Sequence, residues 1–125
     1  EGTATYYYLD AFGQRDSVIT ATCTMDLSQS GNSVSGVLDI YPTQQTDIGE
    51  PGYLPAVQEQ KEIDGHVNGT RFWFYTESYM AIAGDYLELW EFTVENGHMV
   101  GRVTNLDTYA YLGLDSDAGA FVLDK

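Results

Sequence analysis

The chain is poor in cations, cysteine and proline, and each shortage excludes a class of protein. Its 125 residues include 5 Lys and Arg against 19 Asp and Glu, which gives a formal net charge of −14. So acidic a surface argues against binding to nucleic acid or to an anionic membrane, since both attract basic proteins. The single cysteine permits no disulfide within the chain. No apolar run approaches the roughly 18 residues of a membrane span, so we expect no membrane partner.

Alternation of apolar and polar residues runs along most of the chain, and no window shows a helical stripe. The three prolines all lie within 42–56 and nothing resembles a linker, so residues 1–125 are predicted to form one all-β domain. A helical turn is expected near 79–84, and 42–56 is expected to be a long loop. The expected strands are 3–12, 17–28, 33–41, 57–64, 67–77, 85–95, 98–106, 108–114 and 119–124.

One short phrase recurs three times: a turn containing Gly, a few residues, and a second Gly in the following strand. The copies are 30–37 (SGNSVSGV), 64–70 (DGHVNGT) and 96–103 (NGHMVGRV). In each copy the first Gly is predicted to make a tight hairpin turn and the second to bend the outgoing strand. Repeated bent hairpins favour an up-and-down barrel of about eight antiparallel strands, because closure removes exposed edges. A two-sheet sandwich or jelly roll is the alternative architecture.

Two of these hairpins resemble those of a known group of barrels. Residues 24–36 (TMDLSQSGNSVSG) and 90–101 (WEFTVENGHMVG) are similar to hairpins of the calycins, the avidin-like and lipocalin-like small β-barrels. The chain departs from the lipocalin pattern at 2–4 (GTA), where it lacks the N-terminal Gly-x-Trp. The resemblance implies a small ligand-binding barrel.

Aromatic residues are the main functional signal. Along 67–77, Phe72 and Phe74 alternate with Trp73 and Tyr75, so both faces of this strand carry large rings. One face is expected to be core, and the other a ligand cavity, a subunit interface or a surface patch. The interior of a barrel of this size either fills with side chains or holds one small ligand. The residues expected to line such a cavity are Arg71, Trp73, Tyr75, Trp90, Arg102 and Tyr109.

The two arginines of this set each lie in the strand that leaves a repeated hairpin. If Arg71 or Arg102 points inward, its guanidinium would bind a carboxylate or another anion. On the outer surface, either would instead form an ion pair with one of the many acids. In the ligand-binding interpretation the four rings stack on the ligand, Arg71 orients its anionic group, and 42–56 acts as a lid.

The sequence contains no recognisable catalytic or metal-binding motif, so we expect no catalytic residue, no metal and no cofactor. Glu59 and Glu62 are separated by an odd number of positions, as are Glu88 and Glu91. Odd spacing places the two members of each pair on opposite faces of a strand, which argues against acid–base catalysis by either pair.

Three further features are expected to be structural. His66 and His98 each follow a Gly of the repeated phrase and are expected to belong to turns. Residues 115–119 (DSDAG) resemble an oxygen-rich calcium loop but lack its later acidic ligands, so a hairpin turn is expected there. Cys23 lies on the apolar face of its strand and is expected to be a small buried hydrophobe.

The expected function is binding of a small apolar or aromatic ligand, with or without an anionic group, by a secreted or cell-surface barrel. One alternative is a structural cell-surface or filament subunit that forms homo-oligomers through the strand at 3–12. A barrel isomerase or cyclase that acts mainly by shaping its substrate is a further alternative. Because no catalytic motif is present, we favour a binding protein over an enzyme.

Overall fold

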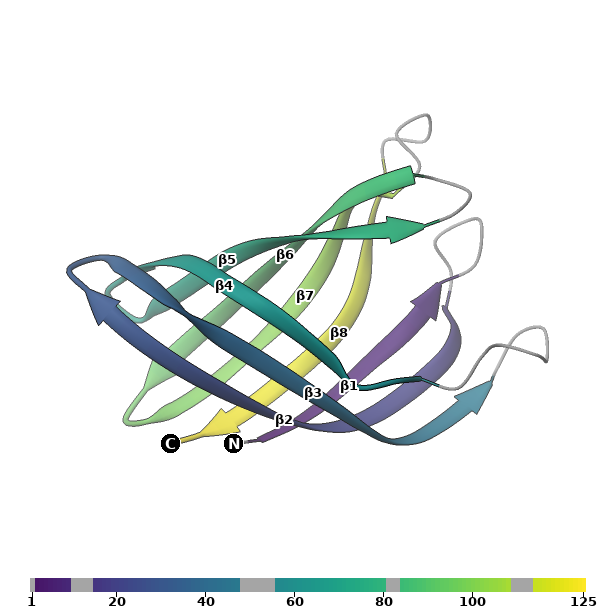
Figure 1. Ribbon diagram of the computed structural model, residues 1–125, viewed down its shortest axis with the longest axis horizontal. Helices are drawn as coiled ribbons and strands as arrows, with labels where there is room; N and C mark the ends of the chain where they lie inside the picture. Colours follow the sequence, from purple (N-terminus) through teal and green to yellow (C-terminus); the bar gives the residue numbers. More distant parts are fainter. Residues whose placement is uncertain (1, 10–14, 48–55, 81–83, 109–113) are drawn as a thin grey trace.

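Eight antiparallel strands form a closed up-and-down β-barrel in the computed structural model, which describes residues 2–9, 15–47, 56–80, 84–108 and 114–125 (Figure 1). The strands are β1 (Gly2–Leu9), β2 (Arg15–Ser30), β3 (Ser33–Asp47), β4 (Glu59–Asn68), β5 (Arg71–Met80), β6 (Gly84–Glu95), β7 (His98–Thr108) and β8 (Leu114–Asp124). Each strand pairs with the next along the chain, and β8 pairs with β1. The barrel prediction is confirmed, and the sandwich alternative is not what forms.

Three tight hairpins, together with the first and last described residues, lie at one end of the barrel, which we call the turn end; the opposite end is the far end (Figure 1). Gly31 and Gly69 have positive φ at the first central position of their turns, and Asn96 and Gly97 have it at both positions. These are the patterns of type II′ and type I′ turns, whose twist matches that of the flanking strands. The first and third predicted turns are therefore confirmed.

The middle turn was predicted at the wrong glycine. Gly65 lies inside β4 opposite Phe74, and the chain turns four residues later, at Gly69. The reason is steric: a Cβ at Gly65 would lie 2.8 Å from the carbonyl oxygen of Trp73 and 2.9 Å from a ring carbon of Phe72. A glycine inside β4 therefore makes room for the backbone and rings of β5.

Several other expected boundaries also differ. Strand β3 continues to Asp47, into the expected loop 42–56, because Pro42 pairs with β2 and residues 44–47 resume the pairing after a bulge. Residues 79, 80 and 84 belong to strands rather than to a helical turn, and residues 115–119 lie within β8 rather than in a hairpin turn. The expected strand 108–114 falls mostly outside the described residues, and its ends belong to β7 and β8.

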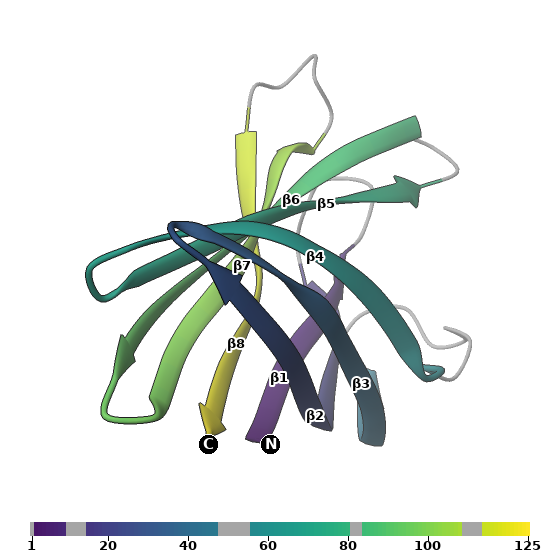
Figure 2. The same ribbon diagram turned by 60° about the vertical axis from the view of Figure 1, so that its left-hand side comes forward.

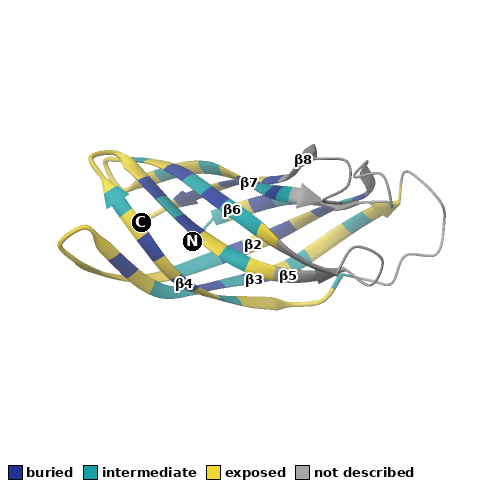
Figure 3. Ribbon diagram, turned by 90° about the horizontal axis from the view of Figure 1, so that it is seen from above, coloured by how far each residue is buried: buried dark blue, intermediate teal, exposed yellow. Residues whose placement is uncertain are grey.

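Buried and exposed residues alternate along the strands, so that one face of every strand lines the interior (Figure 3). Cys23 is fully buried, as predicted, and burial raises the pKa of its thiol to about 11. The buried hydrophobic residues are Ala4, Ile19, Ala21, Cys23, Val34, Leu38, Ile40, Ile63, Phe72, Phe74, Trp90, Phe92, Val103, Phe121 and Leu123.

The barrel is not equally closed along its length. The β4–β5 ladder pairs only residues 65–68 with 71–74, and the β1–β8 ladder pairs only 2–6 with 119–123. Both ladders lie in the half nearer the turn end. Toward the far end the barrel separates into two four-stranded halves, β1–β4 and β5–β8, and Figure 2 shows β4 curving away from β5.

Candidate functional site

The middle of the barrel is filled by aromatic rings. Phe74 stacks on Trp90 with ring centroids 5.4 Å apart, and Trp90 meets the edge of Phe121 at 4.9 Å. Phe72 and Phe92 stack at 5.9 Å on the side of the cluster nearer the turn end. These contacts are aromatic core packing of the usual geometry. A ligand cannot occupy this level of the barrel without displacing the cluster.

Of the residues expected to line a ligand cavity, the structure places the β5 members and Arg102 outside the barrel. Phe72 and Phe74 are buried, so Arg71, Trp73 and Tyr75, which alternate with them, face outward. Trp90, by contrast, is part of the buried core. Tyr109 lies outside the described residues. The sequence could not decide which face of β5 is inside, because both faces carry rings.

On the outer surface, the two arginines border a shallow hollow of about 390 Å³. Arg71 Nη2 donates a hydrogen bond to Glu91 Oε2 at 3.2 Å, and its guanidinium carbon lies 4.5 Å from the centre of the Trp73 ring. Arg102 is aligned with Glu91 across the β6–β7 pair. The structure thus places Arg71, its Glu91 and Trp73 partners and Arg102 on the outer surface rather than in an interior cavity.

A polar cluster inside the barrel was not predicted from the sequence. Glu88 Oε1 accepts hydrogen bonds from Lys61 Nζ at 3.2 Å and from Thr76 Oγ1 at 2.9 Å. The Trp90 indole nitrogen donates to Thr76 Oγ1, also at 2.9 Å. The side chains of Lys61 and Glu88 are only 17% and 12% exposed. The pair therefore connects β4 of one half to β6 of the other through the barrel interior.

Glu59 lies two residues before Lys61 and thus on the same, inward face of β4. Desolvation raises the pKa of the Glu59 carboxyl group, the Glu88 charge raises it further, and Lys61 opposes both effects. The expectation that Glu59 and Glu62 lie on opposite faces fits this geometry. The sequence reasoning missed that Glu59, which stays exposed, and Glu88, which is shielded, lie on the inward faces of different strands. The available signal was that Lys61 is two residues from the apolar Ile63, and Glu88 two residues from Trp90, so each charged residue shares a strand face with a core residue.

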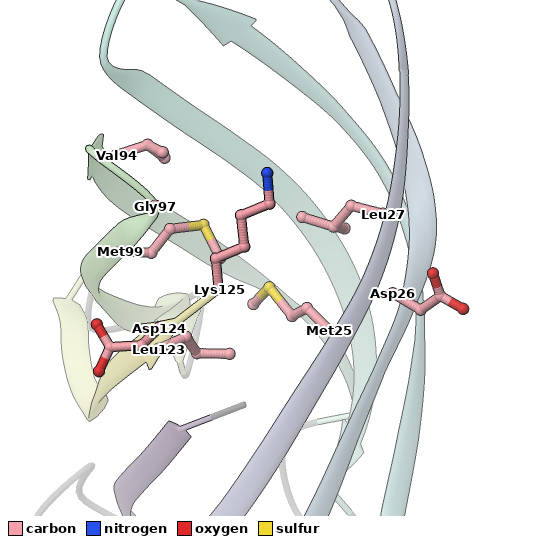
Figure 4. A pocket seen from close by; sticks show the side chains of 9 residues that line it. All are labelled: Met25, Asp26, Leu27, Val94, Gly97, Met99, Leu123, Asp124 and Lys125. Carbon is pink, nitrogen blue, oxygen red and sulfur yellow. The ribbon is translucent and has the colours of Figure 1, made fainter.

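An open apolar pocket of about 460 Å³ lies at the turn end (Figure 4). Its apolar side chains come from β2, β6, β7 and β8, and the Lys125 side chain extends across it, whereas the carboxylates of Asp26 and Asp124 point away. The pocket is bounded on one side by the β6–β7 turn, where Lys125 N donates to Gly97 O at 2.7 Å. Its lining residues are Met25, Asp26, Leu27, Val94, Gly97, Met99, Leu123, Asp124 and Lys125.

The two histidines lie apart, and each contacts a different side chain. His98 Nδ1 contacts Asp124 Oδ1 beside the β6–β7 turn, as a turn-associated residue should. His66 lies inside β4, not in a turn, and its ring is 5.7 Å from that of Trp73. Among the described residues, no group of three His, Cys, Asp or Glu side chains is placed to hold a metal ion.

The described residues also include no helix long and apolar enough to cross a membrane. Comparison of the chain with protein-family models, with curated proteins and with solved structures finds no match.

Proposed function

We propose that this protein binds a small apolar or aromatic ligand in the pocket at the turn end. The observation that carries the proposal is the pocket itself: an open hollow of about 460 Å³ in the mouth of the barrel. Small-molecule sites typically measure about 300–1,000 Å³ and often lie in barrel mouths. The aromatic cluster in the middle of the barrel limits how deeply a ligand could enter, so the ligand would be compact rather than a long chain.

The pocket lining matches an apolar ligand. Met25 and Met99 supply flexible, polarisable thioethers that adapt to irregular ligand shapes. Leu27 is 36% exposed, so a ligand that covers it removes apolar surface from water. The pocket therefore offers several apolar contacts that remain open to solvent without a ligand.

Lys125 would add selectivity for ligands with an acidic group. Its side chain reaches across the pocket in Figure 4, and its ammonium group is a mobile point charge with three hydrogen-bond donors. The proposed ligand class is therefore a compact apolar or aromatic molecule, bound more tightly when it carries an anionic group. This class agrees with the expectation from the sequence, but the proposed site differs from the predicted one.

The fluorescent probes anilinonaphthalene sulfonate, which is anionic, and N-phenylnaphthylamine, which is neutral, test this proposal. We expect both probes to gain fluorescence with the native protein. Leu27→Gln should weaken the binding of both probes by about fivefold, which is equivalent to about 1 kcal/mol of lost apolar contact. Lys125→Gln should weaken only the anionic probe.

The matched control is Val122→Gln, which alters another exposed apolar residue, 40% exposed, outside the pocket. It should leave both affinities unchanged. Failure of both probes to bind, or an equal loss in Val122→Gln, would contradict the proposal.

No specific observation favours assembly through the N-terminal strand. Residues 2–6 of β1 pair with β2 on one side and with β8 on the other. That part of the strand therefore has no edge available for a second molecule.

A further inference from the structure

The seam between β4 and β5 leaves two strand edges without a neighbouring strand. Each strand has 10 residues, but their ladder joins only four from each. Residues 59–64 of β4 pair with β3 on one side, and residues 75–80 of β5 pair with β6 on one side. In the described part of the chain, no strand pairs with the other side of either stretch.

These stretches are therefore edge strands within an otherwise closed barrel. An edge strand presents a row of backbone N–H and C=O groups that an added extended segment can use as a template. Six residues on each edge match the usual length of a strand in a globular protein. Closed barrels normally remove such edges, so this seam is the part of the described surface best suited to strand addition.

The charge along the seam selects the kind of segment. Residues 59–64 and 75–80 contain four acidic residues and one cation, Lys61. That cation points into the barrel and is paired with Glu88, so it does not offset Glu62, Asp64 and Glu77, the three acids on the outer face. Glu62 and Glu77 are both exposed on the outer face. Tyr75, which is 52% exposed, adds an aromatic contact beside the same seam. The seam thus complements a basic segment.

The same charges oppose pairing between two copies of this chain. A second copy would bring an acidic edge against an acidic edge, and like charges directly opposite each other destabilise a strand pair. The net charge of −14 adds long-range repulsion between copies. The favoured occupant is therefore a segment of a different, basic protein.

We propose that the β4–β5 seam is a docking site for an extended, Lys- or Arg-bearing segment of another protein, which adds as a strand to the edge of β4 at residues 59–64. Backbone hydrogen bonds to that edge supply the main attraction. Glu62 and Glu77 select basic side chains on the outer face. The site is separate from the turn-end pocket and does not depend on ligand binding there.

A peptide of alternating Lys and Thr, acetylated and amidated at its ends, tests the proposal. Its binding is measured by calorimetry at low salt, and its location by amide hydrogen exchange. We expect the amides of 59–64 to gain protection while those of the β2–β3 and β6–β7 turns stay unchanged. The same peptide with alternate residues N-methylated should bind on the order of tenfold more weakly, because it loses backbone hydrogen bonds.

Charge variants provide the second part of the test. Glu62→Lys should weaken binding of the Lys-Thr peptide by about threefold or more. Glu95→Lys makes the same exchange at an exposed residue at the turn-end terminus of β6 and should have a much smaller effect. Leu27→Gln should have none, which separates this site from the proposed ligand pocket. Equal binding of the N-methylated peptide, protection outside 59–64 and 75–80, or no binding at millimolar peptide would overturn the proposal.

Discussion

At the scale of single residues, the Lys61–Glu88 pair is the feature that most needs an explanation. An ion pair this shielded from water gains little over apolar packing, because desolvation of two charges offsets most of their attraction. Its position suggests a geometric role. It joins β4 to β6, on opposite sides of the seam where the β4–β5 ladder has ended. The pair therefore holds the two halves together where backbone hydrogen bonds no longer do, and Thr76, on β5, donates a hydrogen bond that helps to fix the Glu88 carboxylate in place.

Removing one partner of this pair should be much worse than removing both. Lys61→Met leaves the Glu88 charge shielded and unpaired, and we expect a loss of about 3 kcal/mol in the free energy of unfolding at neutral pH. Adding Glu88→Leu should restore most of the lost stability. Urea unfolding gives the free energy of unfolding of the single and the double variant.

Arg71→Met is the surface control, because it breaks a pair whose arginine side chain is 58% exposed. Exposed pairs contribute about 0–1 kcal/mol, so this variant should stay close to the native protein. Equal losses in Lys61→Met and Arg71→Met would show that the interior pair has no special structural role.

The sequence predicted some residue environments and not others, and the reason is visible at β5. Cys23 was placed correctly because its strand has one clearly apolar face. In β5 the alternation of Phe72 and Phe74 with Trp73 and Tyr75 gives no such contrast, so a one-residue choice of face decides where Arg71 points. The interior pair depends on which residues of β4 and β6 meet across the barrel, and alternation within one strand carries no such information.

At the scale of elements, turn chemistry located two hairpins and misplaced the third. The middle copy contains two competing turn pairs, Asp64-Gly65, which favours a type I′ turn, and Gly69-Thr70, which has Gly at the first position as a type II′ turn requires. Packing decides between them, because β5 leaves no space for a side chain at Gly65. Local propensity cannot show this, since the neighbours of Gly65 come from the next strand.

Substitutions at these two glycines should show whether the turn lies at Gly65 or at Gly69. Gly65→Val should cost more than about 3 kcal/mol, because its side chain would overlap the Trp73 carbonyl oxygen and the Phe72 ring. Gly69→Asn should cost only about 1–2 kcal/mol, since no atom crowds that position and the cost is that of a positive φ. Thermal or urea unfolding gives the order, and the reverse order would place the turn at Gly65.

At the scale of the whole molecule, the barrel could be predicted but its incomplete closure could not. Repeated short hairpins along a single chain favour sequential pairing, and one extra pair between the first and last strands closes the sheet. The residue at which each ladder ends depends on how neighbouring strands diverge once the barrel has closed. The β4–β5 seam and the two halves therefore have no signature in the sequence, and neither does the pocket formed by four separate strands at the turn end.

The net charge of −14 makes a prediction that involves the whole surface. Most acids have no cation to pair with, so self-repulsion should destabilise the folded chain at low salt. Screening shortens the Debye length from about 10 Å at 0.1 M salt to about 3 Å at 1 M. We therefore expect the Tm to rise from low salt to ~1 M NaCl and then to level off.

Calcium and magnesium chloride at matched ionic strength distinguish screening from specific binding. Under screening alone, both salts should raise the Tm by similar amounts, because neither cation needs a defined site. A gain in millimolar calcium that magnesium does not reproduce would instead indicate a calcium site, for which 115–119 (DSDAG) is the candidate stretch. Continued stabilisation through multimolar NaCl would contradict simple screening and would identify the acidic surface as an adaptation to salt.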